Sequence, residues 1–140
     1  MDNAEPKKEL SKNDLFDRWI EYKKIIHRTG RKWEYREREV WWCAIGENVG
    51  SEINGKGRNF LRPVLIVRKY GTLFFGVPLS SRMHDGIWYE QFRFKDKMQC
   101  ALLSQAGSMC AFRLHDKIGK LSFLDYLRIC DSLSKLILKK

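Results

Sequence analysis

An arginine and a serine at the ends of two neighbouring apolar segments are the residues best placed to do chemistry in this 140-residue chain. Arg62 opens a segment that continues Pro-Val-Leu-Ile-Val, and Ser80 closes the next one, which reads Val-Pro-Leu-Ser. If the two segments form an antiparallel hairpin, the guanidinium and the hydroxyl lie side by side at one edge of a sheet. A fixed positive charge beside a hydrogen-bonding hydroxyl is suited to binding a phosphate group.

The distribution of charge favours a polyanionic partner. The net charge is +10; residues 1–39 carry 11 basic and 9 acidic side chains, and residues 40–140 carry 16 and 8. The excess therefore belongs to the part of the chain that holds Arg62 and Ser80. A compact basic domain commonly binds nucleic acid. The alternative is a surface charge that only maintains solubility.

The cysteines and the apolar runs limit the other classes of protein. The four cysteines are widely spaced with no Cys-x-x-Cys pair, so we expect no zinc site, no other metal and no cofactor. Three of them lie in apolar stretches, which indicates core residues in a reducing compartment. No apolar run reaches the roughly 18–20 residues of a membrane span, and the start has no signal-peptide core. We therefore expect a cytoplasmic protein without membrane contact.

Hydrophobic periodicity predicts a mainly β fold with flanking helices, in the α+β class. Apolar residues recur at helical spacing over residues 11–27, with Gly30 as the end, and again from Ser122 to the C-terminus. Between them lie short strand-like segments, at 40–45, 63–67, 72–79, 88–95, 100–103 and 108–114. Short strands at this spacing favour a small, closed or half-closed antiparallel barrel. We expect an N-terminal helical extension over residues 1–37 and a barrel domain over residues 38–140.

Three further segments bear on function, and two of them leave alternatives open. The first helix would lay Trp19 and Ile20 over the barrel, although it could also bind a partner or RNA, or occupy the binding groove and inhibit the protein. The glycine-rich residues 47–59 form a loop that would be mobile and able to fold over a ligand. The 88–95 segment has a polar, basic face that suits single-stranded RNA, but a solvated outer face would look the same.

Several short motifs in combination carry a family resemblance from residue 38 to residue 140. They are Glu-Val-Trp at 39–41, Gly-Ser-Glu-Ile at 50–53, Arg-Pro-Val-Leu-Ile-Val at 62–67, Val-Pro-Leu-Ser-Ser at 77–81, Leu-Ser-Gln at 103–105 and a Lys-Ile-Gly turn at 117–119. This part of the chain resembles the PemK/MazF family of toxin endoribonucleases. The resemblance implies an SH3-like barrel with a terminal helix, and a homodimer. It also implies metal-independent, sequence-selective cleavage of single-stranded RNA, chiefly mRNA, and neutralisation by a cognate antitoxin.

The resemblance also assigns roles to Arg62 and Ser80. Arg62 matches the catalytic arginine, which would stabilise the charge of the phosphorane as the 2′-hydroxyl attacks. Ser80 matches the catalytic threonine or serine, which would donate to a phosphate oxygen, and the implied products are a 2′,3′-cyclic phosphate and a 5′-hydroxyl. From the residues alone, Arg62 could instead pair with Glu52 or Glu90, and Ser80 could cap a turn.

The match departs from the family at the general base. Ser104 stands where some relatives carry an acidic residue before Gln105, and a serine cannot act as a carboxylate base. Glu52, His84 and His115 are conceivable substitutes. The further candidates for catalysis or RNA contact are Ser81, Ser104 and Gln105, with Lys56, Arg58, Arg82 and Arg93 for RNA binding alone. A second function stays open: a non-catalytic SH3-like barrel that binds RNA or a protein partner.

Overall fold

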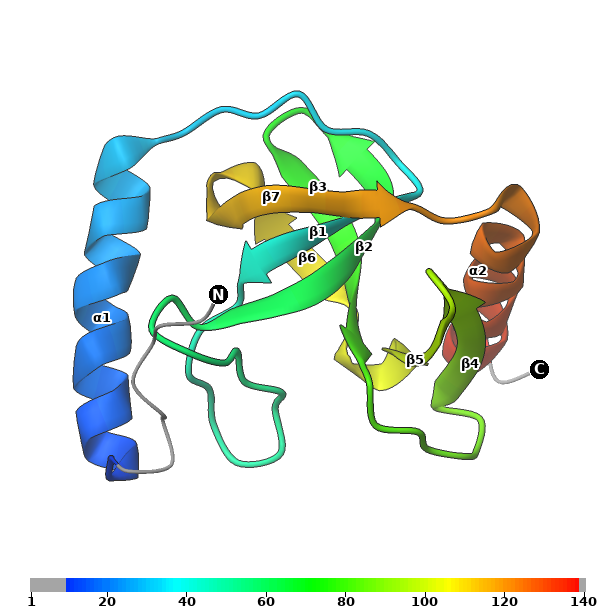
Figure 1. The fold of residues 1–140 in the computed structure, drawn as a ribbon, viewed down its shortest axis with the longest axis horizontal. Helices are drawn as coiled ribbons and strands as arrows, with labels where there is room; N and C mark the ends of the chain where they lie inside the picture. Colours follow the sequence, from blue (N-terminus) through cyan, green and yellow to red (C-terminus); the bar gives the residue numbers. More distant parts are fainter. Residues whose placement is uncertain (1–9, 139–140) are drawn as a thin grey trace.

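Two helices flank a bent antiparallel sheet in the computed structural model, which describes residues 10–138 (Figure 1). Residues 1–9 of the expected extension lie outside the described residues. The elements in chain order are α1 (Lys12–Thr29), β1 (Glu39–Ala44), β2 (Leu61–Tyr70), β3 (Leu73–Ser80), β4 (Tyr89–Phe94), β5 (Lys97–Leu102), η2 (Leu103–Gln105), β6 (Gly107–Cys110), η3 (Ala111–Arg113), β7 (Leu114–Lys120) and α2 (Phe123–Leu138). The predicted α+β class with flanking helices is confirmed.

The sheet is half-closed. Its seven strands are antiparallel and run in the order β4-β5-β3-β2-β1-β7, with β6 also paired to β3. One edge of β3 pairs with β6 in its first half and with β5 in its last two residues, so β3 passes from one part of the sheet to the other. No pairing joins the end strands β4 and β7 in the described chain, so hydrogen bonds do not close the expected barrel into a ring.

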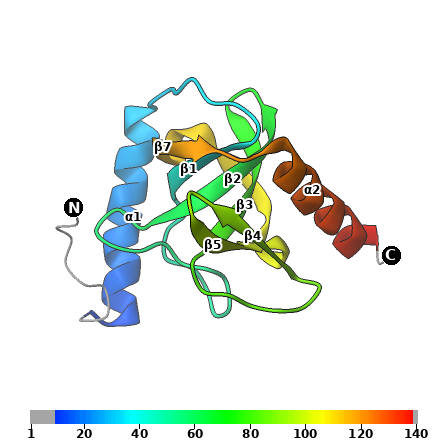
Figure 2. The ribbon, with the colours of Figure 1, turned by 45° about the vertical axis from the view of Figure 1, so that its right-hand side comes forward.

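Three hydrophobic clusters explain why each helix lies where it does. The first joins the sheet to α2 and includes Leu65, Phe92 and Ile129. The second lies on the other face of the central strands, and the third packs α1 against the start of β2. The central strands β1 and β2 are thus covered on both faces, as their continuous apolar runs predict. In both views α1 and α2 lie on opposite sides of the sheet (Figure 2).

The first helix begins and ends where its capping residues predict. The Ser11 hydroxyl accepts a hydrogen bond from the Asp14 amide at 3.1 Å, and Gly30 ends the helix in the left-handed conformation. Trp19 is buried, but Ile20 is 49% exposed. The prediction that both cover the barrel is therefore right for Trp19 and wrong for Ile20. Successive helical residues point about 100° apart, and the face of α1 that carries Leu15 and Trp19 is the one turned toward the core.

Contacts with one loop hold α1 against the sheet. Trp19 packs on Phe60 with 5.4 Å between ring centroids, and its indole covers Gly46. A Cβ at Gly46 would collide with that indole, and the backbone there has a φ of 96° that favours glycine. Lys12 also pairs with the buried carboxylate of Glu47 at 2.6 Å. The helix is thereby docked on the loop that joins β1 to β2.

Three of the boundaries that differ from the sequence prediction concern β2, η3 and β7. Residues 68–70, expected as a turn, continue β2, and the turn falls at residues 71–72. The segment 108–114, expected as one strand, is interrupted by the 3₁₀ turn η3. The expected turn at 117–119 lies inside β7. Pairing with β3 and β1 decides these boundaries, and single-sequence turn preference does not register pairing between distant segments.

The burial of the cysteines agrees with the prediction that they are core residues. Cys43 and Cys100 are buried, and Cys110 and Cys130 are half-buried; all four are free thiols. Burial raises the pKa of Cys43 to about 12, so this thiol is neutral at neutral pH.

Within residues 10–138, no cluster of three or more His, Cys, Asp or Glu side chains could hold a metal ion. In the same residues, no helix has the length and hydropathy to span a membrane.

Candidate functional site

Arg62 is a buried cation that joins a loop to the end of a strand. Its side chain donates from Nε to the carbonyl of Asn54 at 2.9 Å and from Nη1 to the carbonyl of Leu79 at 3.3 Å. The residue is 8% exposed, and burial lowers the pKa of its guanidinium below the ordinary value. An arginine in a protein nevertheless keeps its proton. The structure therefore holds a fixed positive charge between the β1–β2 loop and β3.

The predicted juxtaposition of Arg62 and Ser80 follows from the register of the hairpin. The β2–β3 ladder pairs Val64 with Pro78, and the same register continued by two residues sets Arg62 opposite Ser80. The Ser80 hydroxyl accepts a hydrogen bond from the Arg82 amide at 3.0 Å. It therefore caps the turn after β3, and its hydroxyl hydrogen can still donate to a ligand.

The alternative partners expected for Arg62 are engaged elsewhere. Glu90 pairs with Arg128 at 2.9 Å, and Glu52 accepts from the Val49 amide at 3.0 Å. Within the described residues no ion pair joins Arg62 to either carboxylate. Arg62 does fix the loop, as that alternative proposed, but through the carbonyl of Asn54. In the part of the chain that the structure describes, no carboxylate forms an ion pair with its positive charge.

A cavity of about 460 Å³ lies next to this arrangement, and neither Arg62 nor Ser80 is among its lining residues. Three of the predicted site residues line it: Glu52, Ser104 and Gln105. Ile53 and Pro78 also line it, and each is next in sequence to a residue whose carbonyl binds Arg62. The guanidinium thus lies close behind the cavity wall. The polar residues that sequence reasoning did not select are Asn48, Ser108 and Arg113.

Gln105 clamps the β1–β2 loop to η2. Its Oε1 accepts from the Ile53 amide at 3.1 Å, and its Nε2 donates to the Ser51 carbonyl at 3.1 Å. The amide side chain therefore pairs with the loop as a neighbouring strand would. Asn48 adds a second set of bonds, donating to the carbonyls of Ile45 and Ile53. These bonds do not fit the mobile loop expected from its glycines.

Replacing Gln105 with alanine is expected to release the loop without unfolding the sheet. Both hydrogen bonds to the loop would be lost, and the Ile53 amide would open to solvent. Amide hydrogen exchange of Ile53 should then become at least about tenfold faster, which corresponds to roughly 1.4 kcal/mol. Ser104→Ala, which changes an exposed neighbour, is the control. Unchanged exchange at Ile53 in Gln105→Ala would show that other bonds hold the loop.

The remaining predicted residues lie outside the cavity. Ser81, Arg82 and His84 belong to the β3–β4 loop, where His84 stacks on Tyr89 with 4.7 Å between ring centroids. Both the β1–β2 and β3–β4 loops extend from the same end of the sheet (Figure 1, Figure 2). The other exposed basic candidates are Arg93 on β4, and Lys56 and Arg58 on the β1–β2 loop.

His115 is packed away from the cavity, contrary to a catalytic role. Its Nε2 lies 2.7 Å from the hydroxyl of Tyr22, so the ring meets α1. Burial lowers the pKa of this imidazole and favours the neutral form. Of the three candidate bases, only Glu52 lines the cavity.

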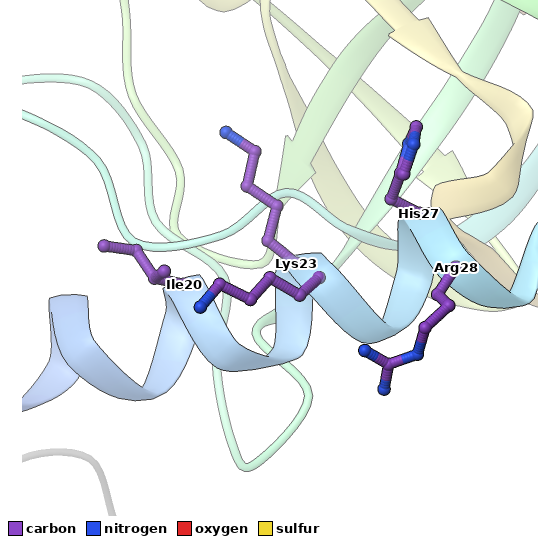
Figure 3. A pocket seen from close by; sticks show the side chains of 5 residues that line it. Ile20, Lys23, His27 and Arg28 are labelled. Atoms are coloured by element: carbon purple, nitrogen blue, oxygen red, sulfur yellow. The ribbon is translucent and has the colours of Figure 1, made fainter.

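A second depression, of about 490 Å³, lies on α1 and includes none of the predicted site residues. All of its lining side chains come from one helix: Ile20, Lys23, Lys24, His27 and Arg28 (Figure 3). It is a gap between the side chains of α1 and not a cleft between elements. We therefore place the candidate site at the cavity beside Arg62.

Arg113 is the cavity residue with the clearest chemistry that the sequence did not single out. It follows Cys-Ala-Phe in a segment that looked like one continuous strand. The 3₁₀ turn η3 instead breaks the segment there and brings Arg113 to the cavity. The only sequence signal for Arg113 was a lone arginine in an apolar run. Such an arginine could equally lie on the solvent-exposed face of a strand or in a binding site.

Comparison with known proteins identifies the fold. No family model matches the sequence, and no curated protein matches it. Among solved structures, MazF from Deinococcus radiodurans in its Form-I crystal matches with a TM-score of 0.63 and 14% identity, over 76% of this chain and 98% of that one. An endoribonuclease in complex with its cognate antitoxin, from a mycobacterial species, matches with a TM-score of 0.60 and 13% identity, over 76% and 98%. The Mycobacterium tuberculosis toxin MazF-mt6 matches at 0.54 and 11% identity, over 71% and 96%. The resemblance to the family found in the sequence motifs thus extends to the fold of about three quarters of this chain.

Proposed function

We propose that this chain, which has the fold of the MazF toxins, is a metal-independent, sequence-selective endoribonuclease that cuts single-stranded RNA, chiefly mRNA, in the cytoplasm. One observation carries the proposal: the buried guanidinium of Arg62 is fixed at the sheet edge beside the end of β3, without a carboxylate to neutralise it in the described chain. A positive charge that is positioned before the substrate binds stabilises the charge that develops on phosphate oxygens. The products would be a 2′,3′-cyclic phosphate and a 5′-hydroxyl.

The proposed roles follow from the donor and acceptor groups that each side chain still has available for a ligand. Glu52, the one carboxylate among the described cavity-lining residues, would accept the proton of the 2′-hydroxyl. That oxygen attacks phosphorus, the bond from phosphorus to the 5′-oxygen breaks, and the 5′-oxygen takes a proton from solvent. Arg62 would bind the phosphate through its remaining N–H groups, and Ser80 through its hydroxyl hydrogen.

The test is incubation of the purified chain with a long single-stranded RNA in EDTA, followed by mapping of the cut ends. Discrete cuts that leave 5′-hydroxyl ends are the expected result. A Glu52→Gln variant, in which the side chain keeps its size and loses its basicity, should cut much more slowly. Intact RNA after long incubation with the wild-type chain would overturn the proposed activity.

A second candidate function has its own support. Both hydrogen bonds that Arg62 forms within the described residues go to backbone carbonyls, and the Ser80 hydroxyl caps a turn. A fold with these residues in structural roles could bind RNA, or a protein partner, without cutting it. The same incubation separates the two, because this candidate predicts binding of RNA with no new ends.

We also propose a homodimer that a cognate antitoxin neutralises. One mycobacterial relative of the same fold was solved in complex with its cognate antitoxin. The outer face of α2 exposes apolar side chains, with Leu124 79% and Ile137 69% exposed, as protein interfaces often do. We further propose that residues 1–37 are an addition to a MazF-like part; the match covers 76% of this chain and so leaves room for such an extension. Light scattering tests the dimer, and a monomeric mass at micromolar concentration would overturn it.

A further inference from the structure

We propose that Arg113 is a second phosphate-binding residue of the cavity, and that α1 holds it in position for the RNA. This inference rests on the proposed function for the identity of the ligand. Arg113 lies on η3, which contacts α1, and it lines the cavity together with Glu52 and Gln105. It is partly exposed, so its guanidinium can meet a ligand in the cavity.

Two contacts fix the direction of this side chain. Its Nη1 donates to the carbonyl of Ala44 at 3.0 Å. Its guanidinium carbon lies 5.6 Å from the ring centroid of Trp19, a cation–π distance. One N–H group is thus used for positioning, and the others remain for a phosphate, whose oxygens match the planar fork of arginine.

The charge of Arg113 is not neutralised by a carboxylate of the described residues. Across residues 10–138, no acidic side chain forms an ion pair with this guanidinium. A structural arginine at a loop would more commonly be paired with a carboxylate or solvated on an outer surface. Here it lines a cavity whose wall also includes Ile53 and Pro78, each next in sequence to a residue whose carbonyl binds Arg62. Two separated cations suit a strand of RNA, which presents a phosphate at every nucleotide.

The first helix acts through this contact and does not touch the cavity itself. No described residue of α1 lines the cavity, which argues against the expectation that the helix occupies a binding groove. Trp19 is held by Phe60 and by the close approach of Gly46. Its ring in turn supports Arg113. Trp19 is therefore a positioning residue, and Arg113 is the residue that meets the RNA.

The experiment measures binding of a fluorescent 2′-O-methyl oligonucleotide, which lacks the attacking hydroxyl and cannot be cut by this reaction. Anisotropy titrations at several salt concentrations give the affinity and its salt dependence. Arg113→Ala should bind about tenfold more weakly. Its slope of log affinity against log salt should become less negative by about 0.7, the value for one phosphate contact on a single strand. Arg113→Lys should keep the slope and recover part of the affinity.

Arg36→Ala is the matched control, because it removes the same charge from an exposed position in the connector between α1 and β1. It should leave both affinity and slope unchanged. Trp19→Phe, which keeps an aromatic face, should retain binding better than Trp19→Leu. Thermal unfolding of each variant shows that the titrations are made on folded protein.

The possible results separate this inference from the proposed function. If Arg113→Ala binds like Arg36→Ala, the inference is wrong, whether or not the wild type cuts RNA. If the wild type leaves RNA intact but its binding depends on Arg113, the endoribonuclease proposal is wrong and the assignment of Arg113 as a phosphate-binding residue is supported. If the wild type does not bind the oligonucleotide, this inference falls, and the cleavage test alone decides the endoribonuclease proposal.

Discussion

Replacing Arg62 with alanine should lower the rate of RNA cleavage by at least about 100-fold, the usual loss when a fixed donor to a developing oxyanion is removed. The guanidinium is the charge that the structure holds beside the end of β3, and alanine cannot replace it. The rate is measured in EDTA from the appearance of new 5′-hydroxyl ends. Cleavage by Arg62→Ala at the wild-type rate would show that the reaction does not depend on this residue.

A stability control is essential for this variant, because Arg62 also binds two backbone carbonyls. Losing those bonds should cost about 1–3 kcal/mol of unfolding free energy, since the carbonyls of Asn54 and Leu79 lose a charged donor. Arg62→Lys keeps the charge but not the fork of N–H groups, so it should also cut poorly. Unfolding by urea, followed by circular dichroism, separates loss of fold from loss of chemistry.

Replacing Trp19 with alanine should lower the free energy of unfolding by about 3–5 kcal/mol, as for other buried large aromatic residues. Trp19 is 6% exposed and packs between Phe60 and Gly46, so its removal leaves a cavity between α1 and the sheet. The measurement is a urea titration in which the change of midpoint and slope are both determined.

Ile20→Ala is the matched control for Trp19→Ala. The two residues are adjacent, but Ile20 is 49% exposed, and substitution there should cost less than about 0.5 kcal/mol. Equal destabilisation by the two variants would mean that α1 does not pack through the face containing Trp19. A loss below about 1 kcal/mol for Trp19→Ala would indicate that the helix is not docked in solution.

Much of the fold followed from local patterns that the sequence carries openly. The apolar runs of β1 and β2 predicted strands covered on both faces, and hydroxyl and glycine residues predicted the ends of α1. The proximity of Arg62 and Ser80 was also predictable, because a short turn forces two neighbouring strands to pair antiparallel. Strand boundaries were less predictable, since pairing with distant strands extends β2 past its expected turn and carries β7 through residues 117–119.

The cavity could not be predicted in the same way, because distant segments build it. Gln105 was selected through the family resemblance, but its bonds to Ser51 and Ile53 depend on how η2 meets the β1–β2 loop. Arg113 reaches the cavity only because η3 breaks an apparent strand. His115 appeared equivalent to His84 in the sequence, yet its neighbour Tyr22 comes from α1, at a separation of 93 residues. Such tertiary contacts leave no local pattern.

The hydrogen bonds that hold the β1–β2 loop determine which substitutions this loop can accept during evolution. Gln105 and Arg62 bind main-chain atoms of residues 51, 53 and 54, which every amino acid at those positions supplies, apart from the amide that proline lacks at residue 53. Side chains such as that of Ser51 can therefore be exchanged while the course of the loop is preserved. Under the proposed function, descendants of this chain could change the bases that they favour through a few loop substitutions, while the sheet and the fixed cation are inherited unchanged.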